Sequence, residues 1–393
     1  MNTFDFGQFA TLLAGVRVES ESDDYVAKYS TGSLGTIGIA ISVSKPLVDS
    51  VAHFTQTVWL PNLQLTMRPT DFLNVRLAAY KAIARPDYNL RLPQFYDQQQ
   101  SGNQYTITSG NQNLRDMEAW NFEANTQFFG GSVGLISVSA FYKKIDNFIH
   151  VTDKIDLDKF YFDSLSQAYN LTFTNPEISN LIHQSNLMKT ALPYNDKSPS
   201  YVWGLEFEHQ MNFNFLPGYW RNITLSYNIS LTRSLTHIIL GKTITTVTRD
   251  SSYNALTRQW TYSNTQRFLK TFELVERESE GQPKLYGNAS LGYDIGGFSA
   301  RLSFFYQDKY VRSYSATDQS NTIVDPFFKM DITLKQKISN SLMIILSCNN
   351  LTDRSETTSE ENAVTINNIS YWKNPRTAEL YGRTIDLGLR ISL

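Results

Sequence analysis

The sequence predicts an all-β protein, an antiparallel transmembrane β-barrel of about twelve strands. Three observations lead to this prediction. Apolar and polar residues alternate along segment after segment, aromatic residues make up 13% of the chain against 18% charged residues, and short connections alternate with long ones. Strands with one apolar face and one hydrated face have this composition and this period of two.

The alternation is clearest in two neighbouring segments. In YVWGLEFEHQMNFNF (201–215) the apolar residues share one register, broken only by His209, whereas Glu206 and Glu208 fall on the other. In NITLSYNISLT (222–232) Ile, Leu and Tyr alternate with Asn, Ser and Thr. A helix would scatter these side chains around its circumference, whereas a strand sorts them onto two faces. The same test predicts strands at 8–19, 59–68, 72–83, 118–128, 134–147, 201–215, 222–232, 284–294, 298–307, 327–338, 341–352 and 381–393.

The connections between these strands are of two kinds. The short ones carry Gly, Pro, Asn or Asp where a tight turn needs them, at 68–72, 129–134, 216–222, 294–298 and 338–342. The long polar ones occupy roughly 20–56, 85–116, 148–200, 233–284, 310–325 and 353–378. Short turns at one end and long loops at the other are typical of outer-membrane barrels, whose two rims lie in different compartments.

Charged residues concentrate on the polar register of the strands. An Arg or Lys that faces lipid at mid-depth costs about 2–4 kcal/mol, so this register is predicted to face the lumen. The predicted lumen-facing residues are Arg17, Arg76, Glu123, Glu206, Glu208, Arg301, Lys329, Asp331, Lys335, Asp386 and Arg390.

Composition argues against several other functions. The formal net charge is −2 and no Lys/Arg run stands out, so no electrostatic footprint for nucleic acid exists. The single cysteine, Cys348, excludes a disulfide framework within the chain, and the five histidines show no metal-ligand spacing. Residues 130–134 match the G-x-S-x-G nucleophile elbow, but a predicted strand follows where that motif needs a helix. We therefore predict a hairpin turn there, and no catalytic residue, metal or cofactor.

Three blocks of the sequence resemble TonB-dependent outer-membrane receptors. They are LPNLQLTMRPTDFLNVRLAAYKAIARPDYNLRLPQF (60–95), GNQNLRDMEAWNFEANTQFFGGSVGLISVSAFYKKIDNFI (110–149), and NNLTDR (349–354) followed by YGRTIDLGLRISL. The resemblance implies a receptor in the cell outer membrane that binds a scarce nutrient, such as a siderophore, corrinoid, glycan or peptide. It also implies import driven through TonB, insertion by the barrel-assembly machinery, and contact with outer-membrane lipid.

The resemblance further implies that residues 1–393 are a partial barrel domain. Barrels of this class have 22 strands around a plugged lumen. Twelve strands would then form the C-terminal part, without the plug domain, the TonB-contacting segment or a signal peptide, and the charged register would face the plug. On this interpretation the strand at 8–19 is expected to be an unpaired edge of an open sheet.

Substrate contacts are expected in the long loops. The loop after the third strand offers charge together with flat aromatic surface, in Arg85, Asp87, Tyr88, Arg91, Phe95 and Tyr96. Arginine can pair with an anionic chelator, and the aromatic residues can stack on a sugar or an aromatic ligand. The same Ala-Arg-Pro-Asp-Tyr element has an alternative, structural role, which is to fix the exit of the loop through Pro86.

The last strand carries the signal that barrel assembly would read. Its residues are Tyr381, Ile385, Leu387, Leu389, Ile391 and Leu393. Outer-membrane barrels typically end on an aromatic residue, usually Phe, whereas this chain ends on Leu393. Two alternatives remain open: an autonomous twelve-stranded outer-membrane barrel acting as a pore or an enzyme, and a soluble β-rich surface-binding protein.

Overall fold

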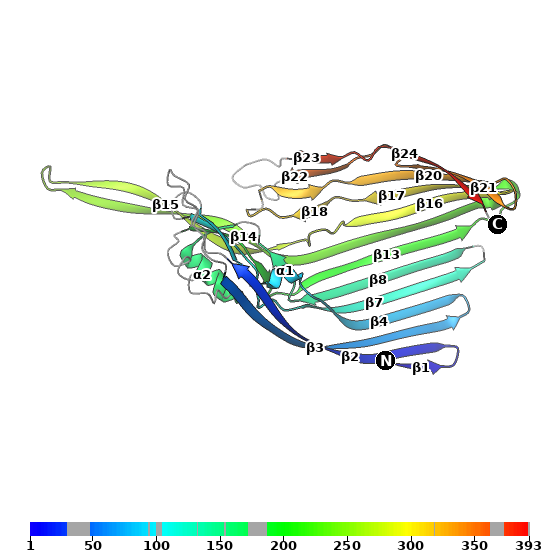
Figure 1. Cartoon of the computed structure of the whole chain (residues 1–393), viewed down its shortest axis with the longest axis horizontal. Helices are drawn as coiled ribbons and strands as arrows, with labels where there is room; N and C mark the ends of the chain where they lie inside the picture. The colour runs from blue at the N-terminus through cyan, green and yellow to red at the C-terminus, as the bar shows by residue number, and fades with distance from the viewer. Residues whose placement is uncertain are drawn as a thin grey trace.

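A single large sheet forms the body of the molecule. The computed structural model describes residues 1–29, 48–92, 95–99, 104–131, 133–152, 155–171, 187–317, 319–361 and 373–391. The sheet contains β1 (Asn2–Phe6), β2 (Ala10–Tyr29), β3 (Val48–Thr70), β4 (Leu73–Ala84), β7 (Met117–Gly130), β8 (Gly134–Asp146), β13 (Ser200–Asn212), β14 (Ile223–Asn254), β15 (Gln259–Arg277), β16 (Leu285–Ile295), β17 (Phe298–Gln307), β20 (Phe327–Lys337), β21 (Leu342–Asn349) and β24 (Thr384–Ile391). Its strands run side by side, with β1 along the lower edge in Figure 1 and β24 along the upper edge.

All twelve predicted strands are present, and each pairs antiparallel with its neighbours in the sheet. The register follows the sequence pattern: Leu205 of β13 lies opposite Ala140 and Leu231, and the next residue, Glu206, lies opposite Ser139 and Ser230. A slip of one residue would move every apolar side chain to the polar face, so this alternation fixes the pairing.

The edge of the sheet differs from the prediction. The strand at 8–19 was expected to be unpaired, but β2 pairs with β1 through five residue pairs, from Asn2 opposite Ala14 to Phe6 opposite Ala10. Gly7 makes this turn possible with φ +61°, a conformation that costs glycine little. The edge strand is therefore β1. Among the described residues the pairings run from β1 to β24 in order, and none joins these two strands.

The long connections contain more structure than their polar sequences predict. Beyond Leu235, β14 pairs with β15 alone and forms an extended hairpin. One short connection, between β13 and β14, contains a 3-10 turn at Gly218–Asn222. The long connections contain α1 (Tyr88–Arg91), β5 (Phe95–Gln99), β6 (Gln104–Ser109), β9 (Ile149–Val151), β10 (Ile155–Asp158), α2 (Lys159–Ala168), β11 (Leu187–Ala191), β12 (Pro193–Asn195), β18 (Tyr310–Ser313), β19 (Asn321–Val324), β22 (Glu356–Glu361) and β23 (Lys373–Glu379). The strands among these elements form three small sheets, and one of these sheets contains the parallel pair β6 and β11.

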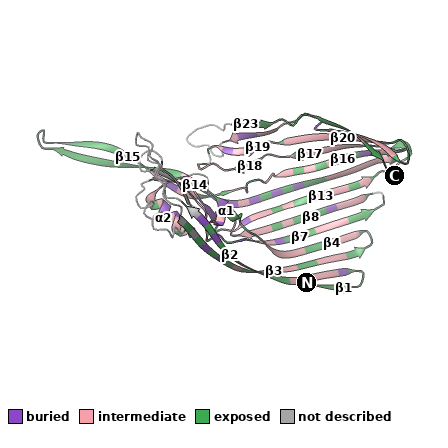
Figure 2. Cartoon of the chain, viewed as in Figure 1, coloured by how far each residue is buried: buried purple, intermediate pink, exposed green. Residues whose placement is uncertain are grey.

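The main hydrophobic core lies among these loop elements and not on a face of the large sheet. Ile155 and Leu157 of β10 are fully buried against Phe162 and Leu165 of α2 and against Ile239 of β14. Figure 2 shows the strands of the sheet largely intermediate or exposed, with buried residues gathering towards α2. Both described helices are too short or too polar to cross a membrane.

The short connections are hairpin turns, as predicted. At 130–134 the strand β8 begins directly at Gly134, so no helix follows the G-x-S-x-G motif and the nucleophile-elbow geometry is absent there. Gly134 has φ +74°, and a Cβ at this position would lie 2.0 Å from the carbonyl oxygen of Gln210. The glycine is therefore needed for the turn and for the close approach of β13.

Candidate functional site

One face of the large sheet collects the charged and amide side chains. We call it the polar face and define it as the face that carries Glu206 and Glu208. Followed from strand to strand, the pairings place on this face every charged residue predicted to face a lumen: Arg17, Arg76, Glu123, Glu206, Glu208, Arg301, Lys329, Asp331, Lys335, Asp386 and Arg390.

The opposite face is apolar and exposed. Leu205 is 55% exposed, Leu231 51% and Leu387 75%. Large apolar side chains exposed together across neighbouring strands would cost a soluble protein about 25 cal/mol per Å² of apolar area left in water. A lipid environment removes this cost, so the two faces of the sheet suit two different solvents.

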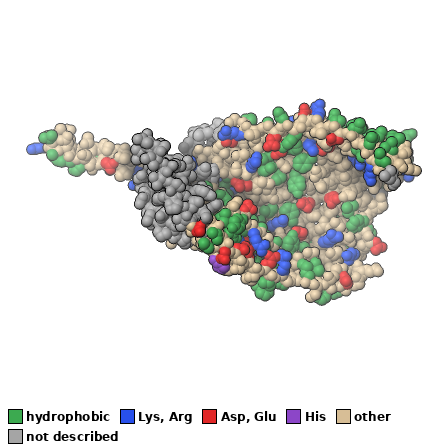
Figure 3. All heavy atoms as spheres, viewed as in Figure 1, with side chains coloured by type: hydrophobic (Ala, Val, Ile, Leu, Met, Phe, Trp, Pro, Cys, Tyr) green, Lys and Arg blue, Asp and Glu red, His purple; other side chains and the backbone are tan. Residues whose placement is uncertain are grey.

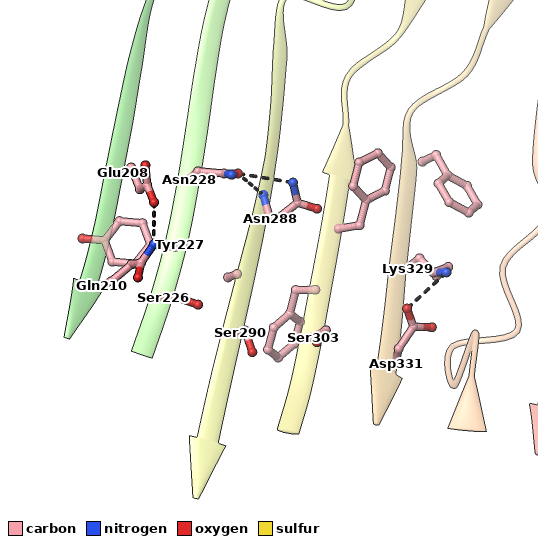
Figure 4. A pocket seen from close by; sticks show the side chains of 14 residues that line it. Glu208, Gln210, Ser226, Tyr227, Asn228, Asn288, Ser290, Ser303, Lys329 and Asp331 are labelled. Atoms are coloured by element: carbon pink, nitrogen blue, oxygen red, sulfur yellow. Dashed lines mark hydrogen bonds and ion pairs between the residues drawn. The ribbon is translucent and has the colours of Figure 1, made fainter. Parts of the chain in front are cut away.

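The polar face contains two hollows. A hollow of ≈ 550 Å³ is lined by residues of β13, β14, β16, β17 and β20. Figure 4 shows Asn228 of β14 and Asn288 of β16 side by side on neighbouring strands. Asn228 Oδ1 accepts hydrogen bonds from the backbone N–H and from the side-chain amide of Asn288, at 3.1 and 3.2 Å. Lys329 Nζ lies 3.1 Å from Asp331 Oδ2. Lys329 and Asp331 are therefore paired with each other, and the third charged group of the hollow, Glu208, accepts a hydrogen bond from Gln210 Nε2 at 2.6 Å.

A second hollow, of ≈ 650 Å³, is lined by residues of β7, β8, β13 and β14 and of the segment between β15 and β16, and it is rich in acceptors. Glu123 accepts a hydrogen bond from Tyr80 Oη at 2.7 Å. Glu280 comes from the segment between β15 and β16, and its burial raises the pKa of its carboxyl group. Ser279 is 8% exposed, and its Oγ has no hydrogen-bond partner within the described ranges. Sequence reasoning missed Ser279 and Glu280, because a polar loop gives no sign that it folds back onto the sheet.

Arg301 shows how a glycine makes room on the polar face. Its guanidinium binds both carboxylate oxygens of Asp294, at 3.1 and 2.6 Å. Arg301 lies directly opposite Gly292, where a Cβ would stand 2.6 Å from Arg301 Nη1. Any side chain at Gly292 would displace the guanidinium from this bidentate pair.

Arg91, one of the predicted substrate contacts, is buried at 1% exposure and anchors its loop to the sheet. Its Nε donates to the Leu114 carbonyl at 3.0 Å, one Nη donates to Glu21 at 2.9 Å, and the other donates to Asp116 at 2.5 Å. The guanidinium also lies 3.7 Å from the centre of the Phe54 ring. All faces of the side chain are therefore occupied, so Arg91 holds the loop in place and is not available to a ligand in this structure.

The other predicted loop contacts are distributed differently. Arg85 is half exposed and pairs with Glu21 at 2.7 Å and Glu19 at 3.0 Å. Asp87 is exposed, and Tyr88 is 59% exposed with its ring 5.1 Å from that of Tyr25. Phe95 and Tyr96 lie in β5, opposite Ser109 and Thr108, and their side chains lie outside the described part of the chain.

A buried histidine at the base of the loops was also missed by the sequence reasoning. His150 of β9 is 9% exposed, and its Nε2 lies 2.8 Å from Thr236 Oγ1, which in turn lies 2.8 Å from Ser200 Oγ. Burial, together with the nearby His237, lowers the pKa of His150 to about 4. The imidazole is therefore neutral at pH 7, and this cluster joins β9 to β13 and β14.

The last strand exposes its apolar register. Ile385, Leu387, Leu389 and Ile391 are 68–75% exposed, Tyr381 is 57% exposed, and Leu393 lies outside the described residues. In the described part of the chain β24 pairs with β21 only. No group of three or more His, Cys, Asp or Glu side chains in the described residues is arranged to hold a metal ion.

Comparison with protein families gives the identity of this sheet. The sequence model described as "TonB dependent receptor-like, beta-barrel" matches residues 1–351. The chain belongs to this family. The antiparallel barrel sheet of a TonB-dependent receptor is thus confirmed as its fold. Among curated protein sequences, none matches the chain.

Solved structures similar to this TonB-dependent receptor barrel are themselves receptors and transporters. The ferric enterobactin receptor PfeA of Pseudomonas aeruginosa, as a G324V mutant, is 14% identical with a TM-score of 0.55, and the match covers 99% of this chain and 52% of PfeA. The hemophore receptor HasR of Serratia marcescens, in complex with its hemophore HasA and heme, is 14% identical with a TM-score of 0.55, covering 99% and 50%. The siderophore receptor PirA of Acinetobacter baumannii is 12% identical with a TM-score of 0.53, covering 100% and 44%. This chain therefore spans about half the length of these structures.

Proposed function

We propose that this chain is part of an outer-membrane receptor that binds a scarce nutrient outside the cell and passes it through its lumen without chemical change. The observation that carries the proposal is the two-sided sheet, whose exposed apolar face suits lipid and whose polar face is hollowed and charged. Membership of the TonB-dependent receptor-like family supports TonB as the source of energy.

We propose further that residues 1–393 form the C-terminal part of a 22-stranded barrel. The match to about half of each neighbouring structure supports this, as do the two strands, β1 and β24, that pair on one side only among the described residues. The remaining strands would complete the ladder at these edges, since an unpaired strand edge is unfavourable in lipid. The plug domain and the TonB contact would lie in the rest of the receptor, with the plug against the charged polar face. The barrel-assembly machinery would read β24.

The proposed nutrient is a chelated metal, with corrinoid, glycan and peptide as the other classes. The names of the neighbours support this order, because they are receptors for ferric enterobactin, for a siderophore and for a heme-carrying hemophore. The exposed loop residues Asp87 and Tyr88, with the half-exposed Arg85, are proposed to contact it. Phe95 and Tyr96 remain predicted contacts.

A growth experiment tests the proposed function. The gene is deleted from its host, which is then grown with one limiting nutrient at a time: iron as a ferric siderophore, heme, cobalamin, an oligosaccharide or a peptide. The proposal expects a growth defect on one of them, restored by the intact gene, and the same defect in a strain that lacks TonB. Undiminished growth on all five, or uptake that persists without TonB, would contradict it.

A further inference from the structure

The hairpin of β14 and β15 extends far past the ends of the neighbouring strands. From Thr236 to Asn254, β14 pairs with β15 alone, and a ribbon of this length is about 60 Å long at 3.3 Å per residue. Figure 1 shows it continuing in the strand direction, away from the sheet and beyond α2. We call residues 243–270 the distal hairpin. All of its residues are exposed except Leu269 and Lys270, which are half-buried.

The two faces of the distal hairpin differ in chemistry. Cross-strand partners share a face, so the pairs Tyr253 with Trp260, Ser251 with Tyr262, and Thr245 with Phe268 define one side, which we call the aromatic face. Its large side chains are exposed by half or more, and they are Val247, Tyr253, Trp260, Tyr262 and Phe268. The other face, which we call the hydroxyl face, carries Thr246, Thr248, Ser252, Thr261, Ser263 and Thr265.

The aromatic side chains are held in place by local contacts. The rings of Tyr253 and Trp260 lie 5.2 Å apart, and the Arg249 guanidinium lies 4.5 Å from the centre of the Tyr262 ring. Figure 3 shows hydrophobic side chains on the projecting arm, together with a basic side chain at its tip and an acidic one along its length. A two-stranded ribbon has no second layer to cover such a face and is only marginally stable in water by itself. A binding partner that covers the aromatic face would therefore stabilise the hairpin.

The charged side chains of the distal hairpin indicate whether a binding partner would be anionic or cationic. The distal hairpin holds four cationic side chains, Arg249, Arg258, Arg267 and Lys270, and a single carboxylate, Asp250. Asp250 lies on the hydroxyl face, where Thr265 Oγ1 donates to it at 2.7 Å. The aromatic face thus carries Arg249 and Lys270 with no acidic side chain. Two copies packed through this face would bring like charges together, and an anionic partner would not.

The arrangement of the rings favours a linear polymer. Protein-binding hot spots cluster their aromatic residues near the centre of an interface. Here Tyr253 and Trp260 form one row, Tyr262 lies in the next row about 7 Å away, and Phe268 lies about 20 Å further along the hairpin. The two rows between Tyr262 and Phe268 hold Arg249 with Asn264 and Val247 with Gln266, so the rings are spread along the length of the face. Flat rings can stack on sugar faces, hydroxyl and amide groups can bond sugar hydroxyls, and arginine can pair with carboxylates.

We propose that the aromatic face of the distal hairpin binds an extended anionic polysaccharide at the cell exterior. Arg249 and Lys270 pair with its acidic groups, and Tyr253, Trp260, Tyr262 and Phe268 stack on its rings. This binding is separate from the passage of a nutrient through the lumen, and it holds whichever nutrient is transported.

Titration calorimetry on the full chain in detergent tests the proposal, with polygalacturonate as the anionic polysaccharide, dextran as a neutral one and poly-L-glutamate as an anionic polypeptide. We expect polygalacturonate to bind at least tenfold more tightly than either other polymer. Trp260→Ala is expected to weaken it about tenfold, Trp260→Phe to keep most of the affinity, and Ser263→Ala on the hydroxyl face to change nothing.

Two arginines on opposite faces of the hairpin allow a controlled test of the role of charge. Arg249 lies on the aromatic face and Arg267 on the hydroxyl face, so Arg249→Gln and Arg267→Gln remove the same charge from opposite sides. The proposal expects a loss of about fivefold or more from Arg249→Gln and less than twofold from Arg267→Gln. Equal losses, equal binding of poly-L-glutamate, no effect of Trp260→Ala, or no binding of polygalacturonate would each overturn it. The first two would show a surface that attracts any polyanion.

Discussion

Substitution of Leu205 by Lys tests which face of the sheet meets lipid. Leu205 lies near the middle of β13 and is 55% exposed, so a longer side chain meets no steric barrier there. A Lys that faces the bilayer midplane costs about 2–4 kcal/mol. The control is Glu206→Lys, one residue along the same strand, whose side chain enters the second, acceptor-rich hollow beside Glu123 and Glu280. We expect this change to cost less than about 1 kcal/mol, since a cation there meets carboxylates.

The two variants are compared by equilibrium unfolding in guanidinium chloride, with the chain inserted in phosphatidylcholine vesicles and its tryptophan fluorescence as the signal. The expected cost of Leu205→Lys corresponds to a factor of about 30 to 1000 in the folding equilibrium, and that of Glu206→Lys to a factor of less than about 5. If Glu206→Lys costs as much as Leu205→Lys, or if Leu205→Lys costs nothing, the assignment of the apolar face to lipid is wrong.

Three further outcomes follow from the described contacts. Arg91→Met should destabilise its loop by about 3–5 kcal/mol, because it leaves the buried Asp116 carboxylate unpaired. Adding Asp116→Leu should recover part of this loss, and limited proteolysis measures the stability of the loop in both variants. Gly134→Ala should cost more than about 1 kcal/mol because of its φ of +74°, whereas Gly131→Ala, with no atom within 4 Å of its added methyl, should cost little in the same unfolding assay. His150 has a pKa of about 4 in the folded chain against 6.5 in the unfolded one, so its neutral form is favoured by folding and this stability is lost as the pH falls from 6.5 towards 4. Melting temperatures across that range should show a loss of about 3 kcal/mol, which His150→Gln should remove.

The sheet was predictable because its strands repeat one simple pattern. In β13 every second residue from Tyr201 to Met211 is apolar or aromatic apart from His209, and a membrane strand needs that alternation along its whole length. The same pattern placed Glu206 and Glu208 on the polar face. Strand β1 was missed because five residues are too few for a periodicity to stand out.

The loops were less predictable because their structure depends on contacts far apart in the sequence. The distal hairpin was predicted to be part of a polar loop, because threonines and serines fill one of its faces and interrupt the other. Arg91 suited ligand binding on its residue type, but its burial comes from Glu21 and Asp116, which are 70 and 25 residues away along the chain. A single sequence gives no sign of such pairings.

The most direct test of the account is a measurement of which face of β13 touches lipid. With Cys348, the only cysteine, replaced by Ser, single cysteines are placed at each position from Val202 to Gln210 and spin-labelled in the membrane-inserted chain. Accessibility to oxygen, which partitions into lipid, should peak at Trp203, Leu205 and Phe207, and accessibility to a water-soluble nickel chelate should peak at Glu206 and Glu208. Accessibilities that show no period of two, or that peak in the opposite phase, would contradict the account.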